Sequence, residues 1–430
     1  MDRVIVIGCG FAGLHAVRQL AGAPVEVTLV DQHNFHTFQP LLYQVATAGL
    51  EPGDVAYPAR TIIRRKRNIA FRHGRVEAVD LEARAVRLGD GGILDYDHLI
   101  VGTGATAGFF DIEGAAAHAH PLYTLDDANH LRNLVLTRLE EVDAHNRSGG
   151  PGRLLVVGGG ATGVETAGAL VELLQVCVRY DRMRLDASRV EVVLIDAAER
   201  LLVGFAEELG LYAAETLRSR GVVVRVGTSV EKVTDRGVRL AGGEHLDALV
   251  VVWAGGVTVE GTLAGSLAVA HGRGGRVVVG ADLSLAGHPE VFVVGDAAAV
   301  PAGPGAPAVV PQLAQVAIQS GRHAGRQVLR RMAGRPTEPF AYEDKGMMAT
   351  IGRRAAVAQL PGGLVLRGTL GWLAWLGLHL VYLIGFRNRL IVLVNWWWRY
   401  LNWPGGPRLI DTAASGDLAG AEATGKDGRG

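Results

Sequence analysis

The chain has 430 residues, enough for two or three domains that each bury a core. Its 43 lysines and arginines balance its 43 aspartates and glutamates, so no overall basic charge favours nucleic acid as a partner. The two cysteines, Cys9 and Cys177, form neither a CxxC redox motif nor part of a zinc set, and we predict no metal site. The N-terminus enters an apolar strand at once and leaves no room for a signal peptide, so we expect the body of the protein in the cytoplasm.

A glycine-rich turn near the N-terminus is the first motif that indicates a chemistry. An apolar strand from Val4 runs into Gly8, Gly10 and Gly13, and a helical pattern follows. In this strand–turn–helix context, GxGxxG lets a pyrophosphate approach the backbone at the positive end of a helix dipole. The next strand, VEVTLVD, ends in Asp31, where an acid can accept hydrogen bonds from a ribose diol.

The same motif recurs in the middle of the chain. A strand from Leu154 leads into Gly158, Gly160 and Gly163, and the strand VEVVLID ends in Asp196. This second acid follows at a greater separation, which predicts a longer helix or an insertion around residues 180–189. Two such motifs in one chain predict two dinucleotide sites. Asp196 favours NADH over NADPH because it would repel a 2′-phosphate, an effect that Arg200 could partly offset.

Two further strands indicate which nucleotide the first motif binds. One lies in LDYDHLIVGTGA, residues 94–105, and the other, HPEVFVVGDAAAV, begins at His288 and leads into Gly295 and Asp296. Asp296 alone fits an ordinary helix N-cap. In two-dinucleotide flavoproteins, however, such a strand returns to the first domain and its aspartate binds the ribityl chain of FAD. We therefore predict an α/β fold with two Rossmann-like domains: an FAD domain formed by residues 1–118 and 264–340, and an NADH domain, residues 119–263, inserted between them.

Residues 341–410 form a C-terminal region of different composition. From 361 to 410 it contains five arginines and no acid, and residues 370–386 carry no charge over a length near the lower limit for a bilayer span. Further on, Asn388, Asn395, Arg399 and Asn402 recur at helical spacing and share one face. With the many tryptophans, this pattern favours helices that lie at a membrane surface, and a true span or a buried surface stays open. Residues 411–430 are predicted to be disordered.

Five segments together resemble the type II (non-proton-pumping) NADH:quinone oxidoreductases: HTFQPLLYQVATAGLEPGDVA, VVGGGATGVETAG, VFVVGDAA, PQLAQVAIQSG and DKGMMATIG. The resemblance covers residues 1–410, although Gly102-Thr103-Gly104 stands where the family usually has Ala-Thr-Gly. It implies bound FAD, NADH as the hydride donor, and a membrane quinone, menaquinone or ubiquinone, as the acceptor of two electrons and two protons. It also implies a homodimer attached to the cytoplasmic face of the membrane through C-terminal amphipathic helices.

The resemblance further implies roles for four residues. Glu165 would lie near the nicotinamide and the flavin, although an acid at a helix start can simply complement the dipole. Gln315 and Gln319, four apart on a predicted helix, would donate to a quinone carbonyl as it gains charge, and Lys345 would add positive charge nearby. Glutamines that cap loops and a solvated lysine remain alternatives.

The implied cofactor contacts lie in the two glycine turns, at the strand ends and in the segments beside them. They are Gly8, Gly10, Phe11, Ala12, Gly13, Asp31, Gln32, Pro40, Leu41, Gly102, Thr103, Gly104, Gly158, Gly160, Thr162, Gly163, Asp196, Gly255, Gly295, Asp296, Gln312, Leu313 and Ala314.

Two other functions share the nucleotide motifs. One is a soluble FAD-dependent reductase that passes electrons to a ferredoxin-like protein, and the other is a flavin redox sensor. The reductase has no reason for a tryptophan-rich C-terminus, and a sensor would oxidise NADH only slowly with a water-soluble quinone.

Overall fold

The computed structural model describes residues 1–144, 152–181, 183, 190–302, 309–402 and 408–411. Residues 145–151, most of the predicted insertion at 180–189, residues 303–308 and 403–407, and residues 412–430 of the segment predicted to be disordered lie outside these residues. By packing, the chain divides into two units. Unit 1 consists of Met1–Thr37, Ala56–Thr106 and Val257–Lys345, and unit 2 of Phe38–Val55, Ala107–Gly256 and Gly346–Gly430. The predicted division of the chain into an FAD domain and an NADH domain stays a prediction.

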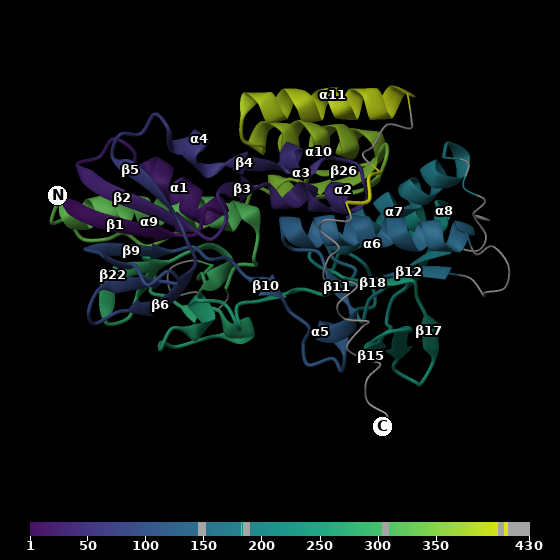
Figure 1. Ribbon diagram of the computed structural model, residues 1–430, viewed down its shortest axis with the longest axis horizontal. Coiled ribbons are helices and arrows are strands. Elements are labelled where there is room, and N and C mark those ends of the chain that lie inside the picture. Colours follow the sequence, from purple (N-terminus) through teal and green to yellow (C-terminus); the bar gives the residue numbers. More distant parts are fainter. Residues whose placement is uncertain (145–151, 182, 184–189, 303–308, 403–407, 412–430) are drawn as a thin grey trace. The chain divides into compact units, whose positions relative to one another are not determined.

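Unit 1 is built on a six-stranded sheet (Figure 1). Its order is β21 (Ser284–Leu285), β22 (His288–Val293), β9 (His98–Val101), β1 (Asp2–Ile7), β2 (Val25–Asp31) and β5 (Ile69–His73). All neighbours are parallel except β21 and β22. The last four residues of β1 are all buried, as expected of a parallel strand covered on both faces.

Two helices of unit 1 pack directly on each other: α1 (Phe11–Leu20) and α9 (Ala314–Met332). A Cβ on Gly321 of α9 would lie 2.0 Å from the carbonyl oxygen of Ala12, so only glycine permits this approach. The smaller elements of unit 1 are β3 (Phe35–Thr37), β4 (Ala56–Pro58), α4 (Ala59–Ile63), β6 (Val76–Asp80), β7 (Ala85–Leu88), β8 (Ile93–Asp95), β20 (Val277–Val278), η4 (Gly295–Ala297) and β23 (Ala298–Ala299). The short strands β10 (Thr106–Ala107) and β19 (Val257–Thr258) occur where the chain passes from one unit to the other.

Unit 2 repeats the design with a five-stranded parallel sheet. Its order is β11 (His120–Pro121), β18 (Val250–Trp253), β12 (Gly152–Val157), β13 (Val190–Ile195) and β14 (Val222–Arg225). As in unit 1, the strand before the glycine turn lies between the strand that ends in aspartate and a strand from later in the unit. The prediction of two Rossmann-like sheets is therefore confirmed.

The helices of unit 2 are α5 (Ala115–His118), α6 (Leu125–Ala144), α7 (Ala161–Arg179) and α8 (Glu207–Ser219), and an antiparallel sheet is formed by β15 (Val230–Thr234), β16 (Gly237–Leu240) and β17 (His245–Asp247). The predicted longer second helix is confirmed, because α7 has 19 residues and α1 has 10. Among the described residues, α7 is also the one helix long and apolar enough to cross a membrane. However, 67% of its most apolar stretch is buried inside the protein, as is usual for a core helix.

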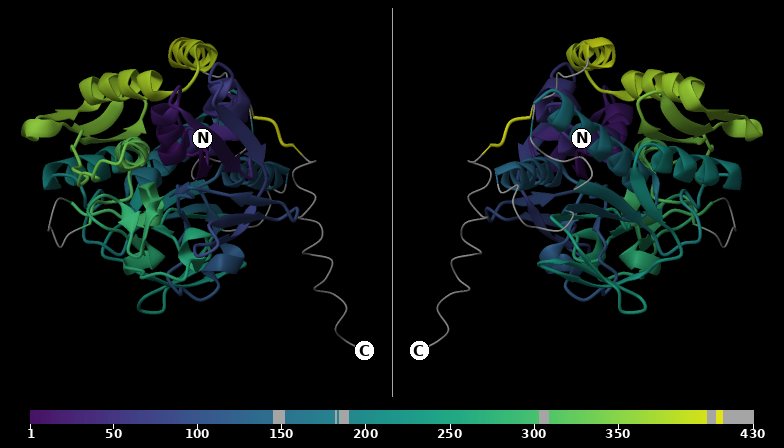
Figure 2. Two further views of the ribbon diagram at one scale, coloured as in Figure 1. Left: turned by 90° about the vertical axis from the view of Figure 1, so that its left-hand side faces the viewer. Right: turned by 90° about the vertical axis from the view of Figure 1, so that its right-hand side faces the viewer.

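From Gly346 onward, the C-terminal region belongs to unit 2. An antiparallel sheet, β24 (Met347–Gly352), β25 (Ala355–Gln359) and β26 (Val365–Arg367), is followed by α10 (Gly368–Tyr382) and α11 (Phe386–Asn402). A Cβ on Gly168 of α7 would lie 2.1 Å from the carbonyl oxygen of Ile351, so α7 and β24 are in close contact. Figures 1 and 2 show α10 and α11 side by side on the outside of the unit. The segment that carries α2 (Leu42–Ala46) and α3 (Pro52–Val55) also packs in this unit.

Candidate functional site

The glycine turn of unit 1 contains two kinds of glycine. A Cβ at Gly8, where φ is +99°, would lie 2.3 Å from the carbonyl oxygen of Gly102, and one at Gly13 would lie 1.8 Å from that of Gly8. These two positions require glycine for the turn itself. By contrast, a Cβ at Gly10 would meet nothing within 4 Å, and the φ of −71° suits any residue. The space in front of Gly10 is therefore open.

The turn of unit 2 repeats this pattern. Gly158 has a φ of +114° and lies against the carbonyl of Ala254, and Gly163 lies against Gly158. A Cβ at Gly160 would again meet nothing within 4 Å. Gly10 and Gly160 are the N-caps of α1 and α7, where the free N–H groups of a helix bind phosphate. The turns thus leave room for a ligand at the position where a pyrophosphate would bind.

Each strand-end aspartate is tied to its glycine turn. Asp31 accepts hydrogen bonds from the N–H groups of Cys9, at 2.5 Å, and His33, at 2.7 Å. Asp196 accepts from the N–H groups of Gly159 and Ala198 in the same way. Burial raises the pKa of Asp31, and the two N–H donors oppose that rise. The sequence did not predict that these carboxylates accept hydrogen bonds from the glycine turns. Each carboxylate still has lone pairs that can accept a hydrogen bond from a ribose hydroxyl.

Arg200 is held by backbone carbonyls of the loop that follows it. Its guanidinium donates to the carbonyl oxygens of Leu202, Val203 and Phe205, at 3.2, 2.9 and 3.1 Å. The N–H of Leu202 in turn donates to the carbonyl oxygen of Gly159 at 2.8 Å, and the Gly159 N–H donates to Asp196, so this loop lies beside the strand-end aspartate. The partial offset of Asp196 by Arg200 stays a prediction.

Among the polar groups of unit 1 that are buried without a hydrogen-bond partner in the described part of the chain, two belong to segments that contact the glycine turn. One is the Thr103 hydroxyl, in the predicted Gly-Thr-Gly segment, and the other is Nε2 of His36. Nδ1 of His36 bonds the carbonyl oxygen of Cys9 at 2.8 Å, so this histidine braces the glycine turn. Burial lowers the pKa of His36 to about 4, and the ring is neutral at pH 7. The sequence does not predict this role of His36, because a single histidine in a three-residue strand belongs to no motif.

The remaining predicted cofactor contacts occupy varied positions. The backbone carbonyl of Asp296, in η4, accepts from Nε2 of Gln312 at 3.0 Å, and a Cβ on Gly295 would lie 3.1 Å from that of Ala12. The others are placed as follows: Phe11 and Ala12 are buried in α1, Gln32 is exposed, Pro40 and Leu41 lie in η1 (Gln39–Leu41), Gly104 has a positive φ, Thr162 is exposed, Gly255 lies beside the Trp253 ring, and Leu313 and Ala314 begin α9.

Glu165 is the fifth residue of α7 and is buried. Its Oε1 accepts a hydrogen bond of 3.2 Å from the N–H of Thr350 in β24. The Trp375 indole N–H of α10 is the other donor beside the carboxyl, but it makes no hydrogen bond of normal geometry in the described structure. Burial raises the pKa of Glu165 to about 8, so the carboxyl is mostly protonated at pH 7. A neutral carboxyl does not complement a helix dipole, and this alternative loses its basis.

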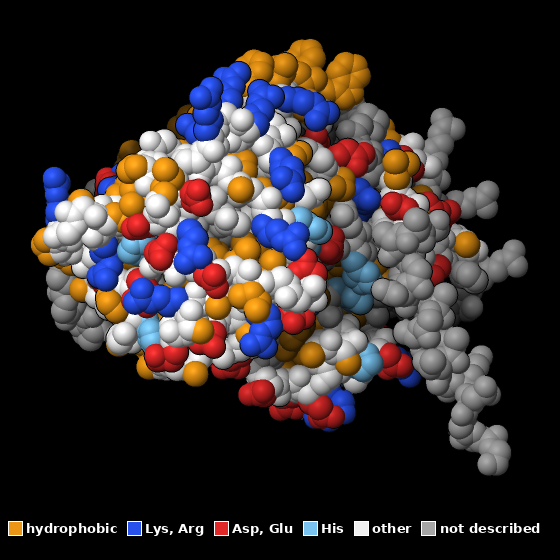
Figure 3. All heavy atoms as spheres, turned by 60° about the vertical axis from the view of Figure 1, so that its left-hand side comes forward, with side chains coloured by type: hydrophobic (Ala, Val, Ile, Leu, Met, Phe, Trp, Pro, Cys, Tyr) orange, Lys and Arg blue, Asp and Glu red, His pale blue; other side chains and the backbone are white. Residues whose placement is uncertain are grey.

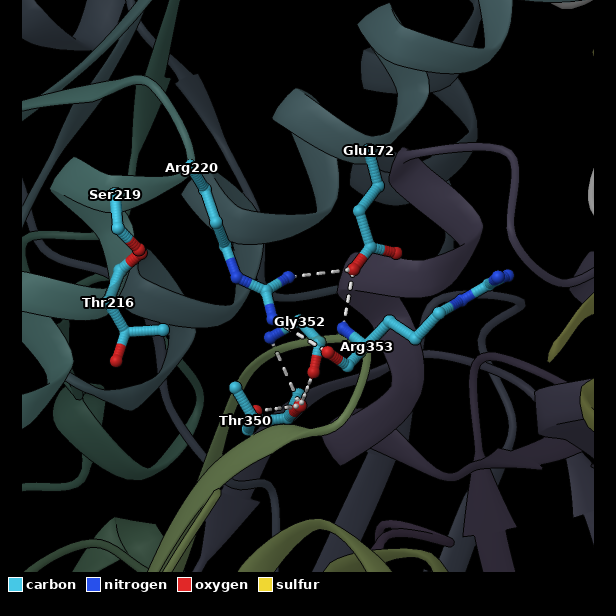
Figure 4. A network of polar contacts seen from close by, with 8 residues as sticks. Glu172, Thr216, Ser219, Arg220, Thr350, Gly352 and Arg353 are labelled. Atoms are coloured by element: carbon cyan, nitrogen blue, oxygen red, sulfur yellow. Dashed lines mark hydrogen bonds and ion pairs between the residues drawn. The ribbon is translucent and has the colours of Figure 1, made fainter. Parts of the chain in front are cut away.

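A second carboxylate of α7, Glu172, has a different environment (Figure 4). Its Oε1 accepts from the Arg220 guanidinium at 3.3 Å and from the N–H of Arg353 at 2.5 Å. Arg220 also donates to the carbonyl oxygen of Arg353 at 2.6 Å. This network fastens the turn between β24 and β25 to α7 and α8, and so holds β24 in place beside Glu165.

Gln315 and Gln319 both lie on α9, as predicted, but their amides differ. Gln319 bonds the backbone of Glu343 twice, donating to its carbonyl at 2.8 Å and accepting from its N–H at 3.0 Å. Lys345 pairs with the carboxylate of the same Glu343. Glu343, which the sequence did not single out, thus brings Gln319 and Lys345 together. Within the described residues the Gln315 amide makes no hydrogen bond, so it is available to a ligand.

The polar stripe of α11 faces the protein. Asn388 donates to the carbonyls of Gly53 and Asp54, both at 3.1 Å, Asn395 donates to the Asp54 carboxylate at 3.1 Å, and the Trp396 indole donates to Gln44 at 2.9 Å. This corrects the prediction of a polar face at a membrane surface, because both asparagines bind α3 and the neighbouring Trp396 indole binds α2. The side chains of Arg399 and Asn402 lie outside the described part.

The outward surface of α10 and α11 is apolar instead, and Figure 3 shows hydrophobic side chains exposed at that end of the molecule. The exposed large side chains are Leu370, Leu373, Val381, Phe386, Leu390, Leu393, Val394, Trp397 and Trp398. Such a continuous group is typical of a surface that binds lipid or another protein.

Comparison with known proteins shows the family. Residues 2–321 match the pyridine nucleotide-disulphide oxidoreductase family, and residues 345–402 match the NDH2 C-terminal domain. The chain is 40% identical to the type II NADH:quinone oxidoreductase NdhA of Mycobacterium tuberculosis over 412 residues, covering 92% of this chain and 86% of the relative. The chain belongs to the type II NADH:quinone oxidoreductase family. The resemblance expected from the sequence is thus confirmed, and the C-terminal match decides against the two alternative functions.

Other members and folds agree with this placement. A type II NADH:quinone oxidoreductase of Staphylococcus aureus is 30% identical over 370 residues, covering 84% of this chain and 90% of that protein. Among solved structures, NDH2 from Plasmodium falciparum in complex with NADH has a TM-score of 0.85 at 18% identity and covers 95% of this chain and 99% of its own. A ferredoxin reductase from Rhodopseudomonas palustris has a TM-score of 0.67 at 21% identity, with 84% of this chain and 83% of that chain covered. The last two show a shared fold.

Proposed function

We propose that this type II NADH:quinone oxidoreductase binds FAD at the glycine turn of unit 1 and NADH at that of unit 2, and reduces a membrane quinone. The observation that carries the assignment is the repeated turn, in which Gly10 and Gly160 face open space at helix N-termini while their neighbours are packed against backbone. When bound, FAD would accept a hydride from NADH and pass two electrons to the quinone. The domain bounds 1–118, 119–263 and 264–340 follow this assignment.

The residues of the first turn fit FAD. The N–H groups of α1 would bind the pyrophosphate, and Asp31 would accept from a ribose hydroxyl. The buried, unpartnered Thr103 hydroxyl supports a further polar contact with this group. Asp296, at the end of the strand that returns to unit 1, would hold the ribityl chain.

The second turn favours NADH over NADPH. Asp196 would accept from the 2′-hydroxyl of NADH and repel the 2′-phosphate of NADPH. The Arg200 guanidinium is engaged by three carbonyl oxygens and would offset this repulsion only in part. The discrimination therefore depends on Asp196.

Quinone reduction needs two protons as well as two electrons, and Glu165 is suited to supply one. Its carboxyl keeps a proton at pH 7 because burial opposes its ionisation. The Gln315 amide would donate to a quinone carbonyl as the oxygen gains negative charge. Gln319 and Lys345 would act through Glu343, by fixing the segment that precedes β24.

The apolar surface of α10 and α11 would attach the enzyme to the cytoplasmic face of the membrane. At 1.5 Å per residue, the 15 residues of α10 extend about 22 Å, less than the roughly 30 Å of a bilayer core, which favours helices lying on the membrane. Binding at the surface gives a lipid-soluble quinone access from the membrane. The homodimer and the choice between menaquinone and ubiquinone stay predictions.

The test separates the two half-reactions. The purified protein should contain one FAD, lose its flavin absorbance with NADH, and regain it with a quinone. Gln315→Ala should leave the first step unchanged and slow the second, whereas Arg322→Ala, an exposed position on the same helix, should alter neither. Absence of FAD would refute the flavin assignment, and a slower first step in Gln315→Ala would move this residue away from the quinone.

A further inference from the structure

The carboxyl of Glu165, proposed above as a proton donor, lies beside the buried indole N–H of Trp375. Trp375 is 1% exposed, yet its indole N–H makes no hydrogen bond of normal geometry in the described structure. A buried N–H normally finds an acceptor, because leaving one unpaired is costly. The carboxyl of Glu165 is the acceptor that this N–H faces.

The surrounding rings prevent Trp375 from turning to another acceptor. His379, one helical turn later, stacks on the indole with ring centroids 4.1 Å apart and planes at 24°. Trp396 of α11 and Tyr43 of α2 pack at 5.8 and 6.3 Å. The His379 ring is itself fixed, since its Nδ1 donates to the Trp375 carbonyl oxygen at 2.8 Å. The indole N–H therefore keeps one direction.

We infer that Trp375 is a positioning residue for Glu165, its N–H held ready for the ionised form of that carboxyl. This rests on the proposed role of Glu165. A neutral carboxyl oxygen is a weaker acceptor than an ionised one. Once the proton leaves, the carboxylate accepts from both Trp375 and the Thr350 N–H, and such charge-assisted bonds are short and strong. The C-terminal region, which contributes both donors, thereby stabilises Glu165 after proton transfer.

The other ionisable groups packed around this site do not take over that role. On α7, Glu172 is paired with Arg220 and the Arg353 backbone. β24 carries no ionisable side chain. On α10, burial lowers the pKa of His379 to about 4, so it is neutral from pH 6 upward. On α2, the Tyr43 hydroxyl accepts from the Gln44 amide at 2.8 Å.

The experiment follows the proton on Glu165 directly. In the full-length, FAD-containing protein, infrared difference spectra would record the C=O stretch of the protonated carboxyl, identified as the band that Glu165→Gln lacks. Trp375→Phe removes the N–H and keeps an aromatic ring, and the midpoint at which the band disappears should rise by about one pH unit, a tenfold change in the protonation equilibrium. Trp375→Leu, which also lacks the indole N–H and carries no other donor, should give the same shift. Trp372→Phe, buried three residues earlier on the same helix, is the matched control and should titrate like the wild type.

Activity gives the second readout. The pH dependence of quinone-driven flavin reoxidation should move upward in both Trp375 variants, and this movement should vanish in a Glu165→Gln background. If the infrared midpoint shifts while the pH dependence of turnover does not, the contact stands and the catalytic role of Glu165 fails. Wild-type midpoints in both Trp375 variants, or an equal shift in Trp372→Phe, would overturn the inference.

Discussion

Replacing Glu165 by glutamine should stabilise the protein, and more so as the pH rises. Glutamine keeps the size of the side chain and an oxygen for the Thr350 N–H, but it does not ionise. Against an ordinary pKa of 4.5, the folded protein holds the pKa of Glu165 at about 8 because the group is buried. Below pH 4.5 the carboxyl is protonated in both the folded and the unfolded protein, and ionisation costs no stability.

Between these values the unfolded chain releases the proton while the folded chain retains it, so stability falls with rising pH. The full cost, reached above pH 8, is about 5 kcal/mol, and about 3 kcal/mol of it is present at pH 7. For a unit of this size, the thermal midpoint of Glu165→Gln should exceed that of the wild type by roughly 5–10 °C at pH 8 and by little at pH 5.

Thermal unfolding of the FAD-containing proteins, followed by circular dichroism from pH 5 to 9, measures this difference. Glu172→Gln is the matched control on the same helix, and it should lower the midpoint because it weakens the network with Arg220 and Arg353. If the Glu165→Gln and wild-type midpoints run parallel across the pH range, the folded protein does not hold this carboxyl protonated and the reasoning is wrong.

Three further outcomes follow from the structure. Gly168→Ala places a Cβ 2.1 Å from a backbone carbonyl oxygen of β24 and should lower the thermal midpoint by several degrees. Gly377→Ala in α10, where a Cβ meets nothing within 4 Å, should leave the midpoint unchanged. Equal midpoints for the two variants would contradict the packing of α7 on β24. Asp196→Asn should raise the KM for NADH and narrow the preference over NADPH in steady-state assays, and an unchanged ratio of kcat/KM values would place the selectivity elsewhere. The double variant Trp397→Gln and Trp398→Gln changes two exposed side chains of α11 and should reduce sedimentation of the protein with phospholipid vesicles. Its rate of NADH oxidation with a water-soluble quinone should not change. Undiminished sedimentation would locate the membrane attachment elsewhere.

The two sheets and the glycine turns could be predicted from the sequence because their signals are local. Strand, turn and helix adjoin one another, and the same pattern occurs twice. Gln315 and Gln319 show where local information ends: their spacing makes them equivalent, but the backbone of Glu343 binds one of them and leaves the other free. That partner lies more than twenty residues away, in a segment without a recognisable pattern.

The asparagines of α11 show a second limit. Helical periodicity correctly places Asn388 and Asn395 on one face, but it does not say whether that face meets water or protein. The answer depends on Asp54, more than three hundred residues earlier in the chain. In the same way, the protonation of Glu165 is set by its burial in the folded unit, which no pattern around Glu165 itself could reveal.

The bond from Asn388 to Gly53 joins residues that are 335 positions apart, and this has a consequence for synthesis in the cell. The segment with α2 and α3 leaves the ribosome long before α11, which packs against it. Closing so long a loop costs chain entropy and is slow. Unit 2 therefore cannot be completed until α11 has been made, and the α2–α3 segment stays uncovered until then. A chain that terminates early would leave the α2–α3 segment uncovered, a feature that chaperones and proteases can recognise.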